Sequence, residues 1–178
     1  MTSATDTVRA PATHPIQVAV VAALSATTML FASLVSALLV RRSFPDWHAS
    51  TAAWPFALLA LGVSTSIAIE GTVREEARRR LPRGVFVLST LAYLASAIAA
   101  IVATTANDGL AAPHEAFVAL LLSLHVLHAA LGSAFALWIL SENSVHVPVS
   151  GRRSLARLVI HFLTALLAAI VTLLFVAS

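Results

Sequence analysis

The chain has 178 residues, of which 59% are hydrophobic and 11% are charged, and its mean hydropathy is +0.91. Water-soluble domains carry about a quarter of their residues as charges, so this composition excludes a soluble globular enzyme. All 11 basic residues are arginines in short clusters, and no basic face follows a helix or strand, so nucleic acid is not an expected partner. The absence of cysteine excludes disulfides, thiolate metal sites and a thiol nucleophile.

Long apolar stretches dominate the chain after a polar beginning. The proline-containing residues 1–15 predict a mobile N-terminal tail, and residues 16–178 predict one transmembrane domain. A helix needs about 20 apolar residues to cross the hydrocarbon core of a bilayer. Five stretches meet this requirement, at about 17–40, 54–73, 84–106, 115–140 and 155–177. We therefore predict an all-α integral membrane bundle of five helices, in which frequent small residues allow close packing.

The arginines predict the orientation of this bundle. With five spans, the tail, the connection between spans two and three and the connection between spans four and five lie on one side. That side carries nine arginines, which are Arg9, Arg74, Arg78, Arg79, Arg80, Arg83, Arg152, Arg153 and Arg157, whereas the other side carries only Arg41 and Arg42. Arginine is enriched on the cytoplasmic side of membrane proteins, so the N-terminus is predicted in the cytoplasm and the C-terminus outside.

Four ionisable residues fall within or at the edge of the predicted spans, and such residues are candidates for function because they are costly in lipid. His125 and His128 lie three residues apart on one face of the fourth span, and His161 lies nearly two turns into the fifth. Since these spans are consecutive and antiparallel, the three histidines are candidates to meet at one interface. Glu70 lies where the second span meets an arginine-rich connection, and we expect it to reach the membrane surface or to pair with arginine.

The histidines admit two interpretations. They can ligate a metal or haem, although His161 lies about 9 Å and His128 about 18 Å from the same side of the membrane, which disfavours a shared ligand pair. Alternatively, they are neutral and bond to Ser, Thr or backbone carbonyls of other helices, or contact lipid or another subunit. No carboxylate lies near them in sequence to support a metal site. We therefore assign no catalytic, cofactor-binding or metal-ligating residue.

Three segments carry a resemblance to a known family. His125-Val126-Leu127-His128, followed by Gly132, is similar to a His-Gly-x-His segment of subunit III of haem–copper oxidases. Ile160-His161-Phe162 resembles the Trp-His-Phe that opens the last span of that family, and the Ser/Thr-rich part of the second span resembles its Leu-x-x-Ser-Ser segment. The likeness covers about residues 16–177 and is closest to the five-span form in bo-type quinol oxidases and to the related small protein of nitric oxide reductase clusters.

The sequence also departs from the family pattern. Val126 replaces a glycine, Ile160 a tryptophan and Thr164 an aspartate, and Ser33 lacks the acidic residue that accompanies it in the family. The resemblance therefore indicates a divergent member that keeps the arrangement of spans.

The resemblance implies a protein of the bacterial inner membrane that acts as a non-catalytic accessory subunit in aerobic electron transport. Its expected partners are catalytic subunit I, other subunits of the oxidase, and phospholipids held between its helices, while haem and copper are expected on the partner subunits. Two alternatives stay open: a haem-b-binding anchor that exchanges electrons with quinone through His125, His128 and His161, and a small transporter or orphan membrane protein. The few charges inside the spans disfavour a pump built from this chain alone.

Overall fold

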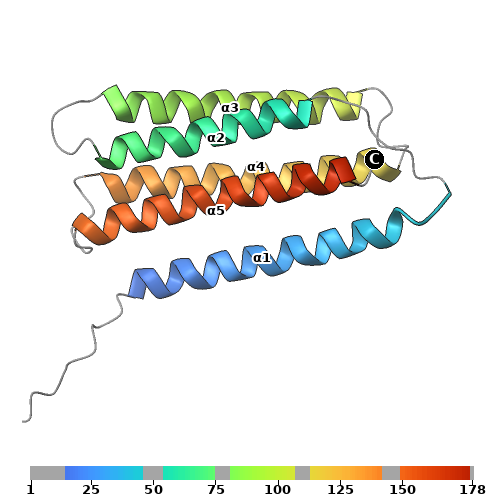
Figure 1. Cartoon of the computed structure of the whole chain (residues 1–178), viewed down its shortest axis with the longest axis horizontal. Coiled ribbons are helices and arrows are strands. Elements are labelled where there is room, and N and C mark those ends of the chain that lie inside the picture. Colours follow the sequence, from blue (N-terminus) through green and yellow to red (C-terminus); the bar gives the residue numbers. More distant parts are fainter. Residues whose placement is uncertain (1–14, 46–53, 75–80, 107–112, 142–148, 177–178) are drawn as a thin grey trace, which may run out of the picture.

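Five helices run side by side along the length of the molecule in the computed structural model (Figure 1). The structure describes residues 15–45, 54–74, 81–106, 113–141 and 149–176, and these ranges contain no strand. The helices are α1 (Pro15–Arg41), α2 (Trp54–Arg74), α3 (Leu81–Ala106), α4 (Pro113–Leu140) and α5 (Val149–Val176). The predicted helical class is confirmed, and each predicted span falls on one helix. The predicted tail, apart from Pro15, lies outside the described residues.

Proline marks the beginning of four of these helices. Pro15 and Pro113 are the first residues of α1 and α4, and Pro55 and Pro82 are the second residues of α2 and α3. Proline suits the first turn of a helix because its missing N–H has no intrahelical partner there and its φ angle is already helical. These prolines explain why α3 and α4 begin a few residues before the apolar stretches at 84 and 115.

The largest difference from the predicted boundaries is at α5, which begins at Val149 rather than near residue 155. The added turns include Gly151, Arg152, Arg153 and Ser154, which lie outside the predicted span. Backbone hydrogen bonding continues where apolar character stops, so the helix extends beyond the segment that composition identifies.

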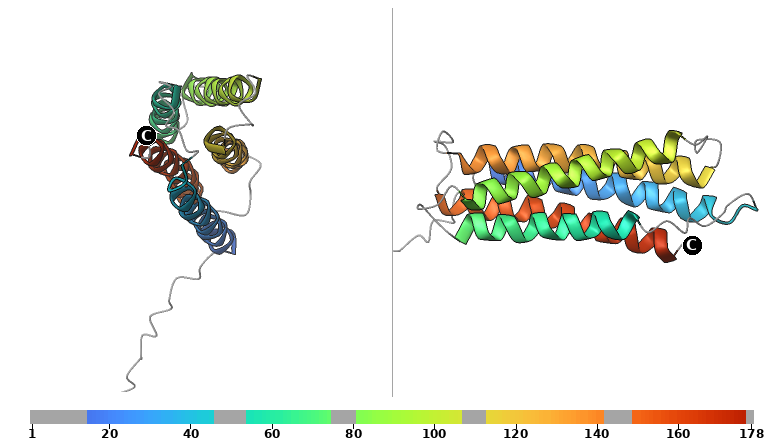
Figure 2. Two further views of the ribbon diagram at one scale, coloured as in Figure 1. Left: turned by 90° about the vertical axis from the view of Figure 1, so that its right-hand side faces the viewer. Right: turned by 90° about the horizontal axis from the view of Figure 1, so that it is seen from above.

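Four helices form a ring, and α1 lies outside it. In the ring α2 packs on α3, α3 on α4, α4 on α5 and α5 on α2 (Figure 2). Among the described helices, α1 contacts only α4 and α5. Successive helices alternate in direction. The last residues of α2 and α4 and the first residues of α1, α3 and α5 therefore share one end of the bundle, which we call the Arg-rich end.

Small residues bring α5 close to two of its neighbours. A side chain at Gly132 of α4 would overlap the Leu163 side chain of α5, and one at Gly62 of α2 would lie 2.8 Å from a methyl group of Leu167. In lipid, where apolar burial does not drive association, such close packing is a main source of helix affinity. The predicted role of small residues in packing therefore applies at these two positions.

The outer surface is apolar. α1, α3, α4 and α5 are each long and apolar enough to cross a membrane, and the described apolar part of α2, Ala57–Val73, is shorter. Large side chains such as Met29, Ile67, Leu88 and Leu131 are exposed on the outside. These features suggest a multi-pass membrane protein.

Candidate functional site

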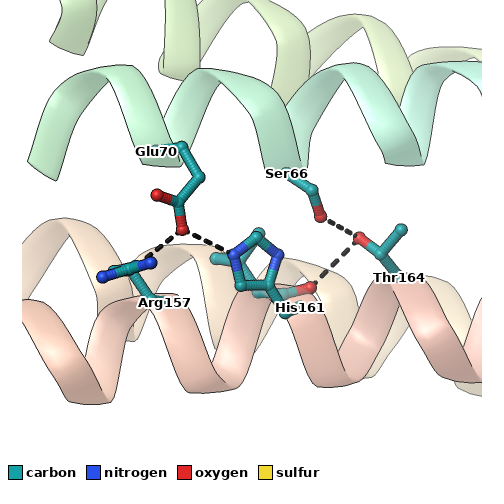
Figure 3. A network of polar contacts seen from close by, with 6 residues as sticks. Ser66, Glu70, Arg157, His161 and Thr164 are labelled. Atoms are coloured by element: carbon teal, nitrogen blue, oxygen red, sulfur yellow. Dashed lines mark hydrogen bonds and ion pairs between the residues drawn. The ribbon is translucent and has the colours of Figure 1, made fainter. Parts of the chain in front are cut away.

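A cluster of three ionisable side chains joins α2 to α5 near the Arg-rich end. Arg157 and His161, four residues apart on α5, face Glu70 in the last turns of α2 (Figure 3). Arg157 Nε donates to Glu70 Oε1 at 2.6 Å, and His161 Nε2 lies 2.8 Å from the same oxygen. A carboxylate oxygen only accepts hydrogen bonds, so His161 carries a proton on Nε2 in this arrangement.

The expectation that Glu70 pairs with arginine is thus confirmed, and its partner comes from another helix. The Glu70 side chain is 20% exposed, whereas Arg157 and His161 are each 45% exposed. The cluster is therefore half open to the surroundings of the bundle and is not a closed core pair.

A second polar contact lies one turn deeper between the same two helices. The Ser66 and Thr164 hydroxyl oxygens are 2.6 Å apart, and Thr164 Oγ1 also lies 3.1 Å from the Ile160 carbonyl oxygen and 3.3 Å from that of Gly62. A hydroxyl has one hydrogen to donate. When Ser66 donates to Thr164, the single Thr164 hydrogen is left for one of the two carbonyl oxygens, of which that of Ile160 is the nearer.

These polar residues border an open groove between α2 and α5 of about 340 Å³. Its remaining lining is apolar and comprises Leu59, Val63, Ile67, Ala165 and Ala168. The groove therefore has an apolar length and a charged end, where Glu70 and His161 contribute to the lining.

His125 lies elsewhere, on the inner side of α4. Its side chain is 1% exposed and meets two aromatic rings edge to face, those of Tyr93 on α3 at 6.1 Å and Phe31 on α1 at 6.3 Å between centroids. His128 also contacts the Phe31 ring, at 5.7 Å, and its Nδ1–H donates to the Leu124 carbonyl of its own helix at 2.7 Å. Within the described residues, the contacts of these two histidines to other helices are thus aromatic, and the His128 hydrogen bond lies within α4.

The structure does not bring the three histidines together. His161 lines the outer groove, whereas His125 lines a central cavity of about 20 Å³ inside the ring of helices. Among the described residues, no three His, Asp or Glu side chains are placed to hold a metal ion together. The reason is that α5 turns His161 towards α2, while α4 turns His125 towards α3 and α1.

Two features of the site were not foreseen from the sequence. The sequence groups Arg157 with the arginines of a connection, whereas it lies in α5 and bonds Glu70; its spacing of four residues from His161 is the available signal. Tyr93 beside His125 carries no signal in a single sequence, because its contact depends on how α3 packs on α4.

Comparison with family models, curated proteins and solved structures gives no match for this chain. The likeness to oxidase subunit III therefore depends on the short sequence motifs alone.

Proposed function

We propose that the chain is a non-catalytic accessory subunit of a bacterial respiratory haem–copper oxidase, which packs against the catalytic subunit and binds phospholipid. The observation that carries the proposal is the groove between α2 and α5. Its apolar walls fit an acyl chain, and its charged end fits a headgroup phosphate. Arg157 bonds Glu70 through Nε and is 45% exposed. An arginine side chain has five N–H donors, so it can bind a phosphate as well.

The dimensions of α2 support a fifth crossing of the membrane. Its 21 residues rise about 31 Å at ~1.5 Å per residue, close to the ~30 Å hydrocarbon core. Glu70 then lies within one turn of the boundary, where Arg157 and a lipid headgroup are also expected. Five crossings put the Arg-rich end in the cytoplasm, since arginine is enriched on that side.

The surroundings of His125 favour the accessory role over a haem-binding anchor. The cavity of about 20 Å³ beside it has room for a water molecule. A porphyrin would have to separate α4 from α3 and displace Tyr93 and Phe31, which contact the His125 ring. His128 uses Nδ1 within its own helix and faces the Phe31 ring.

Purification from native membranes tests the subunit proposal. A tagged chain should co-purify with a haem- and copper-bearing subunit, and the complex should show a Soret band that the isolated chain lacks. A Soret band from the isolated chain that is lost in His128→Ala or His161→Ala would establish the haem anchor instead. A chain that purifies as a lone oligomer would refute the proposal in favour of an orphan membrane protein.

Filling the groove tests the lipid role. Ala168→Leu places a large side chain in the groove, whereas Ala95→Leu, at an exposed position on α3, is the matched control. We expect native mass spectrometry to show at least a threefold loss of bound anionic phospholipid for Ala168→Leu and no loss for Ala95→Leu. Equal retention in both variants would show that the groove does not hold the lipid.

A further inference from the structure

The central cavity lies where all four helices of the ring meet. Its lining includes five polar side chains from these helices, which are Thr65 of α2, Tyr93 of α3, His125 and Ser133 of α4, and Thr164 of α5. Five polar residues around one small space are unusual in the middle of a bundle whose surface is apolar, because a polar group away from water is costly unless it is hydrogen-bonded.

Two of these residues present polar atoms that no other described residue satisfies. The Tyr93 hydroxyl and His125 Nδ1 are fully buried and have no hydrogen-bond partner among the described residues. The side chains are 4% and 1% exposed, and their rings meet at a right angle. Native structures rarely leave buried donors and acceptors without any partner, and an internal water is a common explanation.

The size of the cavity agrees with a single occupant. A space of about 20 Å³ exceeds the ~10–15 Å³ that one water molecule requires, and a buried water typically makes two to four hydrogen bonds. Tyr93 can donate to it, and His125 can donate or accept according to its tautomer. Thr65 Oγ1, which donates to the Leu61 carbonyl at 3.0 Å, keeps lone pairs that accept from it.

We propose that the central cavity is a binding site for one water molecule that bridges the Tyr93 hydroxyl and His125 Nδ1. The water exchanges with the outer groove past Thr164, which lines both the cavity and the groove. The Ser66–Thr164 contact then continues the polar path towards Glu70 and His161. The path gives the interior of α4 access to water and protons from the Arg-rich end. It is independent of whether the chain serves an oxidase.

Thr90 provides a matched control. Its hydroxyl is also buried on α3 without a partner among the described residues, but it does not line the cavity. If the cavity holds water, Tyr93→Phe removes the hydrogen bond between the Tyr93 hydroxyl and that water. The unfolding equilibrium constant in bicelles should then rise about fivefold. Thr90→Val removes a hydroxyl that forms no hydrogen bond with the described residues, so it should leave the unfolding equilibrium constant unchanged or lower it. Equal behaviour of the two variants would refute the proposal.

A direct measurement does not depend on stability. In water-edited solid-state NMR of the full chain in lipid bilayers, polarisation from water should reach the His125 side-chain nitrogens, and Tyr93→Phe should shift the Nδ1 resonance. Thr164→Leu places a larger apolar side chain between the groove and the cavity, so it should slow polarisation transfer from water to His125 at least twofold. Transfer to His125 no faster than to the buried Ala136 would show that the cavity is dry.

Discussion

The contact between Glu70 and its two partners on α5 predicts a measurable part of the stability. Exposed ion pairs contribute ~0.2–1 kcal/mol, and removal of one partner from a buried pair costs ~3–5 kcal/mol. Glu70 is 20% exposed and its partners are 45% exposed, so the cluster lies between these limits. One carboxylate oxygen accepts from both Arg157 and His161. We therefore expect Glu70→Gln to lower the free energy of unfolding by about 2 kcal/mol, between the two limits.

A double-mutant cycle separates the pair from other effects of the substitution. Steric trapping in bicelles should give a coupling of about 1 kcal/mol between Glu70→Gln and Arg157→Met. The cycle of Glu70→Gln with Ser36→Ala is the control and should be additive, because Ser36 lies on α1 and its hydroxyl bonds the Ala32 carbonyl of its own helix. A coupling with Arg157 that is no larger than the one with Ser36 would refute the ion pair as a stabilising contact.

Two further predictions concern packing. Gly132→Leu should destabilise the bundle by about 3 kcal/mol in the same assay, since even a Cβ atom there overlaps Leu163. Gly71→Leu, at a position where an added Cβ meets nothing within 4 Å, should cost less than ~1 kcal/mol. Phe31→Ala should release α1 from α4, because Phe31 is 2% exposed against the α4 histidines. Single cysteines introduced along the α1 inner face should then be labelled at least three times faster. Met29→Ala, at a side chain that is 73% exposed, should leave the labelling unchanged.

The positions of the helices could be predicted from the sequence, because hydropathy and the effect of proline depend on the local residues and not on which helices pack together. A stretch such as 84–106 is apolar whichever neighbour it has, and a proline such as Pro113 limits where a helix begins. The beginning of α5 at Val149 was missed for the same reason, since hydropathy reports the lipid boundary and not the end of backbone hydrogen bonding.

The site is harder to predict from the sequence than the helices, because it depends on how one helix is rotated against another. The sequence puts His125 and His128 on one face of α4 and His161 on α5, but not which neighbour each face meets. A single sequence without depth-resolved contacts allows α5 to turn His161 towards α4 or towards α2. In the structure His161 faces α2, where it contacts Glu70. The sequence identifies both residues as ionisable candidates but does not indicate that they form a pair.

The polar contacts between α2 and α5 hold the helix that has the least apolar length among the described residues. Several Ser and Thr hydroxyls in the described helices, such as those of Thr28, Ser33 and Thr172, bond the carbonyl four residues earlier and need no neighbour. The bonds of Ser66, Glu70 and Thr164 instead cross from α2 to α5. α2 is also the helix with the shortest described apolar stretch. Since lipid supplies little force that holds one apolar helix to another, a helix with less apolar length needs directional contacts to keep its depth and register. Two of the polar residues that weaken α2 as an independent membrane span, Ser66 and Glu70, are thus residues that attach it to α5.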